Sequence, residues 1–530
     1  MSILDSVIML NQLSNAYKVC LINPPIIGVL EPWYDLPDFG RVGLAYLAGY
    51  LRQFPGFDIK IIDAKLERLN FDDVLSRVKA FNPHLVGLTA FTNEIKPAAY
   101  QAALIKQHNP NIVAVIGGVH LTALPKDTLE EFDAFDIGVI GEGEITFYEL
   151  CSALKNSTPI INISGLVYRS EKTICQTPQR QRIADQDSIP FPAWDLLPPA
   201  KSYFVQSERG CPFNCLFCMN PNGKVARKRS VENVIAELNW IINDFKPEHI
   251  SFGDELFSVD MKRTNALLDA MIAEKIGDKV SWDLQTHVHF VDAEMFKKFK
   301  LAKVKRVELG IETGDAEALR KMGKGTNLNK IISACNAAKQ ENVKIGTFFL
   351  FGQPNETLQS LKSTINLAVK LNPDLPMFGL MTPYPGTEIA KMAAKGEGGY
   401  QLLTTDWDEY NKQIGGAMAF ASLSRRQIEW IQIKAYAKVY LYNYRFFDFI
   451  KFVWEYRKGA WEVIKKIILK RNSLTEHLNL KPHDYDVILQ NKPPLNPSTL
   501  VEARDYWISY QQTDALKIKR ELKEEWHNDK

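Results

Sequence analysis

The chain is poor in cysteine and carries almost no net charge. Seven of its 530 residues are cysteine, and 64 Lys and Arg against 62 Asp and Glu leave a formal net charge of +2. Small disulfide-stabilised proteins are far richer in cysteine, and proteins that hold nucleic acid through bulk charge are strongly basic. The composition therefore excludes a disulfide scaffold and argues against a nucleic acid partner.

Long apolar runs are also missing. No stretch reaches the roughly 18 apolar residues of a membrane-spanning helix, so we expect no transmembrane segment. The first residues, MSILDSVIML, lack a basic segment and contain Asp5, so we expect no signal peptide. With 46% hydrophobic and 24% charged residues, the composition is typical of a multi-domain cytoplasmic enzyme in a reducing compartment.

Residues 16–154 alternate short β-rich runs with helix-like segments. Strands that alternate with helices of about 10–15 residues form parallel sheets covered on both faces. The pattern therefore predicts a flavodoxin-like doubly wound domain, in which ligands bind beyond the carboxyl ends of the strands. The strand-like runs are 18–25, 58–64, 85–90, 112–118 and 137–141.

The rest of the chain divides into three parts. Residues 155–200 are polar and proline-containing and predict a connector. Residues 201–396 predict a second α/β unit, a partial (βα)6 barrel with its function at the carboxyl ends of the strands. Residues 397–530 predict a mainly helical region. The strand-like runs of the barrel are 203–210, 249–254, 280–286, 304–312, 344–352 and 377–385, and Ser230 is placed to cap the helix after the first.

Three of the seven cysteines fall in one motif directly after the first barrel strand. Cys211, Cys215 and Cys218 lie in GCPFNCLFCMNPNG. A closed tetrahedral zinc site needs four ligands, whereas three thiolates suit a 4Fe–4S cluster that keeps one iron open to a small molecule. The alternatives are a metal-free cysteine loop and a zinc site that borrows a distant histidine.

At this motif the sequence resembles the radical S-adenosylmethionine superfamily, whose signature is C-x3-C-x-aromatic-C. Phe217 stands at the aromatic position. The resemblance implies that the amino and carboxylate groups of S-adenosylmethionine chelate the open iron. It also implies that electron transfer cleaves the S–C5′ bond to give a 5′-deoxyadenosyl radical.

Later strand ends extend the resemblance. Asp254 and Glu255 match the place where the family accepts the methionine amino group, although a helix cap is the simpler alternative. Gly310–Gly314 resembles the family's G-x-E-S/T-G, which implies that Glu312 and Thr313 contact S-adenosylmethionine. The resemblance also assigns Gln285, at the end of the third strand, to this site.

Three further side chains are candidates for the pocket. His287 and His289 alternate at the end of the third strand and are expected on one face, as metal ligands, acid–base groups or hydrogen-bonded pocket histidines. Tyr384 lies in a P-Y-P-G-T turn that matches the family. One motif departs from it, because Asn355 replaces a glycine in G-x-P-G-E-T.

The N-terminal domain resembles the cobalamin-binding domain of one radical S-adenosylmethionine subgroup. None of the nine histidines lies two residues after an aspartate, so the cobalt-ligating D-x-H-x-x-G motif is absent. If cobalamin binds, a protein imidazole is not expected on its lower face; a domain without cobalamin is the alternative. The residues assigned to cobalamin are Asn23, Pro24, Thr89, Ala90, Gly117, Gly118, Gly141, Glu142, Gly143 and Glu144.

Charge and aromatic residues concentrate near the C-terminus. Residues 425–471 hold 12 basic, four acidic and 12 aromatic residues, so this segment carries +8 and the rest of the chain −6. One interpretation packs the aromatic faces on the barrel with Lys and Arg turned outward. Another makes the segment a lid or docking face for an amphiphilic or anionic substrate, or for peripheral contact with a membrane. Single-stranded nucleic acid is disfavoured because no RNA-binding module is found.

The resulting hypothesis is a cobalamin-dependent radical S-adenosylmethionine methyltransferase acting on an unactivated carbon of a small biosynthetic intermediate, with amphiphilic molecules among the candidates. It would use a 4Fe–4S cluster, S-adenosylmethionine, cobalamin and an external reductant such as flavodoxin or ferredoxin. The enzymatic alternative is oxidative cyclisation or another C–H functionalisation, as in the anaerobic magnesium-protoporphyrin ester cyclases. The third alternative is a catalytically silent cobalamin or redox sensor.

Overall fold

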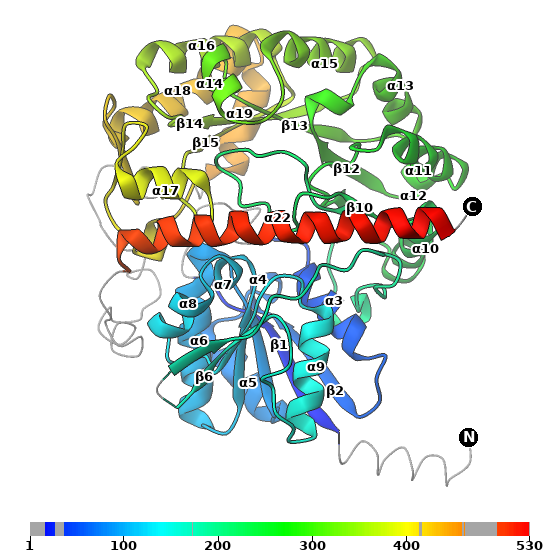
Figure 1. Ribbon diagram of the computed structural model, residues 1–530. Helices are drawn as coiled ribbons and strands as arrows, with labels where there is room; N and C mark the ends of the chain where they lie inside the picture. The colour runs from blue at the N-terminus through cyan, green and yellow to red at the C-terminus, as the bar shows by residue number, and fades with distance from the viewer. Residues whose placement is uncertain are drawn as a thin grey trace.

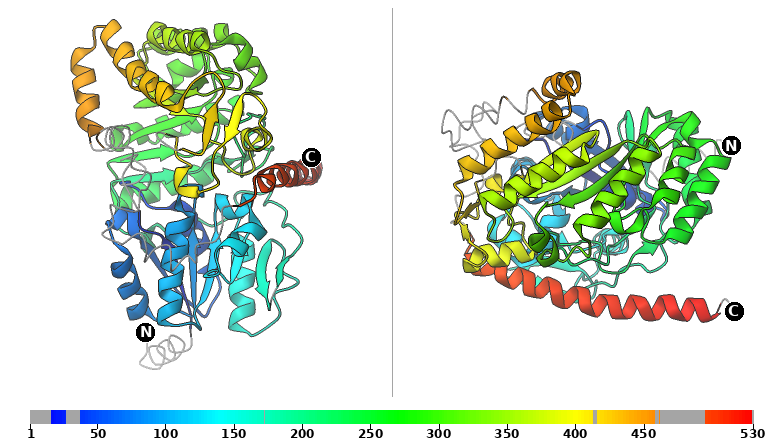
Figure 2. Two further views of the ribbon diagram at one scale, coloured as in Figure 1. Left: turned by 90° about the vertical axis from the view of Figure 1, so that its left-hand side faces the viewer. Right: turned by 90° about the horizontal axis from the view of Figure 1, so that it is seen from above.

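The computed structural model describes residues 16–26, 37–171, 173–412, 416–457, 461 and 495–528. Two α/β units are stacked on one another, and a long C-terminal helix, α22 (Pro497–Asn528), lies along one side of their boundary (Figures 1 and 2). The predicted order of a doubly wound unit, a parallel barrel unit and C-terminal helices is confirmed.

The N-terminal unit is built on one seven-stranded sheet in the order β2-β1-β3-β4-β5-β6-β7. Its first five strands are parallel, which is the doubly wound arrangement. The central strands are apolar and buried, as expected where helices cover both faces. The strands are β1 (Tyr17–Asn23), β2 (Phe57–Asp63), β3 (Leu85–Thr89), β4 (Val113–Gly117), β5 (Ile137–Val139), β6 (Leu166–Ser170) and β7 (Thr173–Gln176).

Helices on the two faces bury separate clusters of apolar side chains. α3 (Val42–Leu51) and α9 (Glu144–Lys155) pack on one face, and α5 (Phe71–Phe81) and α6 (Ile95–His108) on the other. A reciprocal capping box starts α5. The shorter helices are α4 (Ala64–Glu67), η1 (Thr92–Glu94), α7 (Val119–Ala123) and α8 (Pro125–Glu131).

The segment expected to be a plain connector contributes to the sheet. Within residues 155–200, β6 and β7 form a hairpin that pairs antiparallel with β5. These strands are too short for their alternation of apolar and polar residues to stand out in the sequence. Pairing with the existing edge of the sheet stabilises them. Further on, η2 (Trp194–Leu196) buries Trp194, whose indole N–H donates to Glu237 of the barrel unit at 2.9 Å.

The second unit is an open parallel barrel. The strands of its sheet lie in the order β8-β11-β12-β13-β14-β15. The two edge strands, β8 and β15, do not pair with each other, so the barrel is not closed. These strands are β8 (Ser202–Val205), β11 (His249–Phe252), β12 (Ser281–Thr286), β13 (Arg306–Glu312), β14 (Ile345–Phe351) and β15 (Leu375–Leu380). The helices are α10 (Val231–Trp240) with η3 (Ile241–Phe245), α11 (Met261–Ala273), α12 (Ile276–Lys279), η4 (Val288–Phe290), α13 (Ala293–Leu301), α14 (Ala316–Lys321), α15 (Leu328–Gln340), α16 (Leu358–Leu371) and α17 (Glu388–Lys395).

The first predicted barrel strand is divided in two. β8 ends at Val205, and the chain then enters β9 (Glu208–Arg209), which pairs antiparallel with β10 (Arg227–Lys228). The cysteine motif lies in the loop between these two short strands. Ser230 caps α10 as expected, by accepting from the backbone N–H of Asn233 at 3.2 Å.

The C-terminal region closes the open edge of the barrel. After the hairpin of β16 (Tyr400–Leu402), η5 (Trp407–Glu409) and β17 (Met418–Phe420), helix α18 (Arg425–Tyr442) packs along β15. Gln432 donates to the carbonyl of Phe378 at 2.6 Å, and the backbone N–H of Phe378 donates to the hydroxyl of Tyr436 at 3.0 Å. These side chains satisfy an otherwise unpaired strand edge.

Helix α19 (Phe446–Glu455) follows α18, whereas most of the rest of the basic segment, residues 462–471, lies outside the described residues. Within the part of the chain that the structure describes, no helix is long and apolar enough to span a membrane.

Candidate functional site

The cysteine loop is closed by its own backbone. The N–H of Cys211 donates to the carbonyl of Gly223 at 2.9 Å, and the Asn220 side-chain amide donates to the carbonyl of Cys211 at 2.5 Å. Gly210, at φ +108°, brings the loop within contact of the Val225 carbonyl, where a β-carbon would clash. The two ends of the loop are thereby held together, and its three cysteines are free thiols.

A buried cation that the sequence analysis missed faces this loop. Lys324 forms an ion pair with Glu312 at the end of β13, and both side chains are buried. Burial raises the pKa of Cys211 and Cys215 to about 12, while the positive charge of Lys324 acts to lower it. The backbone N–H of Leu216 donates to the Met322 carbonyl at 3.1 Å, which docks the loop beside the lysine. The only sequence signal was a lysine among glycines in KMGKG.

The donor set fits a three-cysteine iron–sulfur cluster. Among the described residues, no three His, Cys, Asp or Glu side chains gather as a site for a single metal ion. A cubane cluster presents a separate iron to each thiolate, so its ligands need not converge on one point. Three free thiols on one loop beside a buried cation match that chemistry.

The structure separates the two neighbouring carboxylates assigned to S-adenosylmethionine. Asp254 is fully buried and accepts hydrogen bonds from the N–H and hydroxyl of Ser207, both at 2.6 Å, and from the N–H of Glu208 at 3.0 Å. Glu255 is half-buried and accepts from the N–H of Gly210 at 3.2 Å and from Asn222. Asp254 therefore ties the end of β11 to the start of β9, and Glu255 is the carboxylate that lies against the cysteine loop.

The other residues assigned to S-adenosylmethionine differ in exposure and in their contacts. Gln285 is exposed and donates to the carbonyl of Asp254 at 2.9 Å. Glu312 lies at a β-bulge with φ +67°, a strained conformation for a residue other than glycine. Thr313 is buried, and its hydroxyl lies 3.1 Å from that of Thr364. Phe217 is half-buried and packs against a small apolar cluster.

The histidine pair does not share one face. β12 ends at Thr286, and the following 3-10 turn buries His287 but leaves His289 exposed. His287 stacks on Phe213 of the cysteine loop with ring centroids 4.4 Å apart, and burial lowers its pKa to about 3. The neutral His287 thus supports the loop, and the expectation of a common face is wrong because the strand ends before either histidine. Tyr384 is half-buried beside the second core cluster.

Glu208 is a second buried group that the sequence analysis missed. It is 1% exposed, and neither carboxylate oxygen has a hydrogen-bond partner. Burial, then the nearby Asp254, raises its pKa to about 9, so it is protonated at neutral pH.

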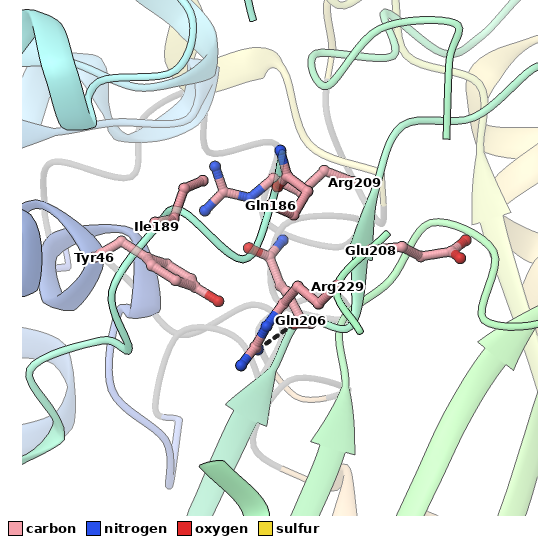
Figure 3. A pocket seen from close by; sticks show the side chains of 7 residues that line it. All are labelled: Tyr46, Gln186, Ile189, Gln206, Glu208, Arg209 and Arg229. Atoms are coloured by element: carbon pink, nitrogen blue, oxygen red, sulfur yellow. Dashed lines mark hydrogen bonds between the residues drawn. The ribbon is translucent and has the colours of Figure 1, made fainter. Parts of the chain in front are cut away.

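Figure 3 shows a hollow at the boundary between the units, lined by side chains that include Tyr46, Gln186 and Arg209, with Glu208 pointing away from them.

Two acidic residues assigned to cobalamin pair with the barrel unit. The side chain of Arg227, on β10, is fully buried and lies 2.6 Å from Glu142. Arg209, on β9, lies 2.8 Å from Glu144. Burial acts to raise the pKa of Glu142, but the two arginines outweigh it and lower the pKa. These ion pairs join the β5 end of the first unit to both strands of the ribbon that carries the cysteine loop.

The remaining cobalamin candidates form the carboxyl edge of the first sheet. Asn23 donates to Asp63 at 2.7 Å, and Pro24 beside it is buried. Gly118, at φ +99°, passes so close to Thr89 and Ala90 that a β-carbon would clash. A β-carbon placed on Gly117 would lie 3.8 Å from its nearest neighbour. Gly141 and Gly143 also present only backbone at this edge. This edge of backbone and glycine fits the flat ring of cobalamin.

A network of buried charged side chains at the same edge was not predicted from the sequence. Arg41 donates to Glu94 at 2.6 Å and to the side-chain oxygen of Asn23 at 3.2 Å, and Lys65 lies 2.5 Å from Glu94. Burial acts to raise the pKa of Glu94, but Arg41 and Lys65 outweigh it and lower the pKa to about 2. Three separate segments supply these charges, which is why no local pattern revealed them.

Of the histidines in the first unit, His120 lies near this edge, where its backbone N–H donates to the Ala90 carbonyl, and His84 lies at the opposite one. His120 is buried, its ring packs edge-on against Trp407 at 4.9 Å, and burial lowers its pKa to about 3. His84 lies at the opposite end of the sheet, where its Nδ1 accepts from the N–H of Lys18 at 2.9 Å.

Comparison with known proteins identifies both units. The family model of the B12 binding domain matches residues 36–151, and that of the Radical SAM superfamily matches residues 205–368. An uncharacterized methyltransferase, PH0819, of Pyrococcus horikoshii is 34% identical over 440 residues, covering 80% of this chain and 92% of that protein. The anaerobic magnesium-protoporphyrin IX monomethyl ester cyclase of Rubrivivax gelatinosus is 27% identical over 384 residues, 69% of this chain and 68% of that one.

Solved structures share the fold. The radical S-adenosylmethionine methyltransferase TsrM of Kitasatospora setae, with cobalamin and a [4Fe-4S] cluster bound, matches with a TM-score of 0.65 and 16% identity over 80% of this chain and 89% of that one. The cobalamin-dependent S-adenosylmethionine radical enzyme OxsB matches with a TM-score of 0.67 and 16% identity over 97% of this chain and 82% of that one.

The chain therefore belongs to the radical S-adenosylmethionine proteins that carry an N-terminal B12-binding domain. Within that class it is a relative of the methyltransferase-like proteins typified by PH0819. The cofactors of the family are cobalamin, a 4Fe–4S cluster and S-adenosylmethionine.

Proposed function

We propose that this protein is a cytoplasmic methyltransferase that uses cobalamin and radical S-adenosylmethionine chemistry to methylate an unactivated carbon of a small biosynthetic intermediate. One observation carries the proposal: buried ion pairs join Glu142 and Glu144 of the B12-binding unit to Arg227 and Arg209 of the ribbon that holds the cysteine loop. They hold the ligand-binding edge of one unit close to the cysteine loop of the other, which supports one reaction site served by both.

When bound, the cluster with S-adenosylmethionine supplies hydrogen abstraction from carbon, and cobalamin supplies the methyl group. The chain's own residues position these groups. Cys211, Cys215 and Cys218 would hold three irons of the cluster. Glu255, beside the loop, offers an acceptor to a cationic amine, and Lys324 offers a buried positive charge to anionic groups.

The relatives favour methyl transfer over cyclisation. The uncharacterized methyltransferase PH0819 is 34% identical to this chain over 440 residues, and the cyclase is 27% identical over 384 residues. A hopanoid C-3 methylase of Methylococcus capsulatus is 24% identical over 385 residues. We propose a small-molecule substrate and an external low-potential reductant such as flavodoxin or ferredoxin.

The test is anaerobic reconstitution of the full chain with iron, sulfide and cobalamin, followed by S-adenosylmethionine and a chemical reductant. We expect 5′-deoxyadenosine from the cluster and, with the true substrate, S-adenosylhomocysteine as well. In the product, methylation adds CH2 to the mass, whereas cyclisation removes hydrogens. Appearance of 5′-deoxyadenosine alone with the true substrate would contradict methyl transfer.

A matched pair of cysteine variants shows whether the loop is responsible. Cys215→Ser should abolish the 4Fe–4S absorbance and cleavage of S-adenosylmethionine. Cys175→Ser changes a half-buried free cysteine on β7, away from the loop, and should keep both. Equal cleavage by the two variants would overturn the assignment of the cluster to Cys211, Cys215 and Cys218.

A further inference from the structure

Helices α18 and α19 expose a group of large apolar side chains that the proposed chemistry does not use. We call this group the aromatic surface; its main members are Tyr442, Tyr444, Phe446, Phe447, Ile450 and Trp454. Phe447 is 88% exposed and Trp454 67% exposed. An interpretation from the sequence alone packed these aromatics on the barrel, and for these residues the structure contradicts it.

The aromatic surface is not what holds α19 in place. The opposite side of the helix packs on α18 through Phe452, whose ring stacks on Tyr436 with centroids 4.8 Å apart and lies 5.6 Å from Tyr440. None of the ten residues of α19 is buried, although most are apolar. A monomeric protein rarely leaves so many large apolar groups together in water, so this face is suited to a partner.

Basic side chains outnumber acidic ones on the two helices that carry the aromatic surface. Residues 425–457 contain seven basic and three acidic side chains, a net charge of +4, which leaves −2 for the rest of the chain. Each acidic group is already engaged by a base of its own helix, as with Asp448, which accepts from Arg445 at 2.7 Å. Arg457 lies over the Trp454 ring at 4.3 Å and Lys438 over Tyr442 at 5.3 Å. The outward-facing excess is therefore basic.

The position of α19 favours a broad, flat partner. The helix, coloured orange, stands at the outer edge of the molecule, on the side opposite α22 in Figure 2. Its side chains Phe446, Phe447, Ile450, Val453 and Trp454 are each between 46% and 88% exposed. A helix with an apolar face, flanking Lys and Arg, and Trp and Tyr among its exposed residues is typical of segments that lie in the headgroup region of a bilayer.

We propose that the aromatic surface binds an anionic lipid membrane, with Phe447, Ile450 and Trp454 entering the headgroup layer. The basic side chains beside them would meet the negative surface of the bilayer. This contact is peripheral, and it does not depend on which carbon the enzyme modifies. It would bring the open edge of the barrel, which α18 covers, close to the lipid surface.

The experiment is flotation of the reconstituted full chain with vesicles. Vesicles of phosphatidylcholine mixed with phosphatidylglycerol should carry the protein upward, whereas vesicles of phosphatidylcholine alone should carry much less. Binding should weaken as salt is raised, because the Lys and Arg contribution is screened. The triple variant Phe447→Ser/Ile450→Ser/Trp454→Ser should reduce binding at least about tenfold, since burial of these side chains supplies much of the free energy.

A control variant separates this surface from general stickiness. Leu301, Leu358 and Leu516 are exposed leucines on other helices, and their triple replacement by serine should leave vesicle binding unchanged. Lys451→Glu/Arg457→Glu should lower binding only to the anionic vesicles. All three variants should retain the cluster absorbance of the wild-type protein, which shows that they are folded.

Three outcomes would overturn the proposal. The first is absence of binding to anionic vesicles, and the second is binding that the aromatic triple variant leaves unchanged. The third is a concentration-dependent dimer in solution that the aromatic variant abolishes while vesicles capture nothing. That result would assign the aromatic surface to a second copy of this chain.

Discussion

The side-chain amide of Gln511, on the C-terminal helix, donates to the backbone carbonyl of Asn220 and to that of Met219, each at 2.9 Å. Met219 directly follows Cys218, and the indole N–H of Trp507 also donates to its carbonyl. A helix almost 300 residues further along the chain therefore holds the end of the cysteine loop.

Replacing Gln511 should loosen that loop. Gln511→Leu removes one hydrogen bond from each of the two carbonyls, at a cost of about 0.5–1.5 kcal/mol per bond. The Met219 carbonyl keeps the indole N–H of Trp507 and the Asn220 carbonyl keeps the N–H of Gly223. We expect a lower melting temperature and less iron retained per chain after reconstitution. The neighbouring Gln512 is exposed, so Gln512→Leu is the matched control and should change neither quantity. Equal iron content in the two variants would contradict the role of Gln511.

Breaking the ion pair between Arg227 and Glu142 should weaken the contact between the units. Arg227→Met leaves the buried Glu142 carboxylate with only the more distant Arg209, at 3.7 Å, which costs up to about 3–5 kcal/mol. We expect a large drop in melting temperature and faster proteolysis in residues 155–200. Arg227→Met/Glu142→Met should recover much of the loss, because the weakly paired carboxylate is gone and Arg209 keeps its ion pair with Glu144. Lys303→Met, at an exposed ion pair with Asp278, should cost only about 0–1 kcal/mol.

Glu208 should make stability depend on pH. Its pKa is raised from 4.5 to about 9, so between these values the folded protein binds a proton that the unfolded chain has lost, and stability falls as pH rises. Glu208→Gln removes this titration. The melting temperature of the variant should therefore rise relative to wild type from pH 5 to pH 9. A difference independent of pH would disprove a protonated Glu208. The exposed Glu248→Gln is the control.

Lys324 should be needed for cluster assembly. Among the described residues, Lys324 is the only side chain that forms an ion pair with Glu312, and Lys324→Met removes it. A buried carboxylate left without its partner costs about 3–5 kcal/mol. We expect reduced iron incorporation and weaker cluster absorbance after reconstitution. Lys321→Met, three residues earlier and exposed, should assemble the cluster normally. Normal assembly in both variants would show that the positive charge beside the loop is dispensable.

The sequence determined what depends on neighbours along the chain. The spacing of Cys211, Cys215 and Cys218 defines one loop, and the alternation of strands and helices predicts both parallel sheets. Gly118 and Gly141 mark turns with positive φ, where other residues would be strained. Each of these features follows from local backbone geometry and periodicity.

Only the tertiary structure decided which charged groups meet. Glu142 and Arg227 are 85 residues apart, and nothing local to either indicates that they pair. The same holds for the buried Lys324 beside the cysteine loop and for Gln511 at its end. Asp254 and Glu255 look alike in the sequence, yet one ties two strands together and the other faces the loop. Burial and long-range pairing set these roles because the free energy of a charge depends on its surroundings in space.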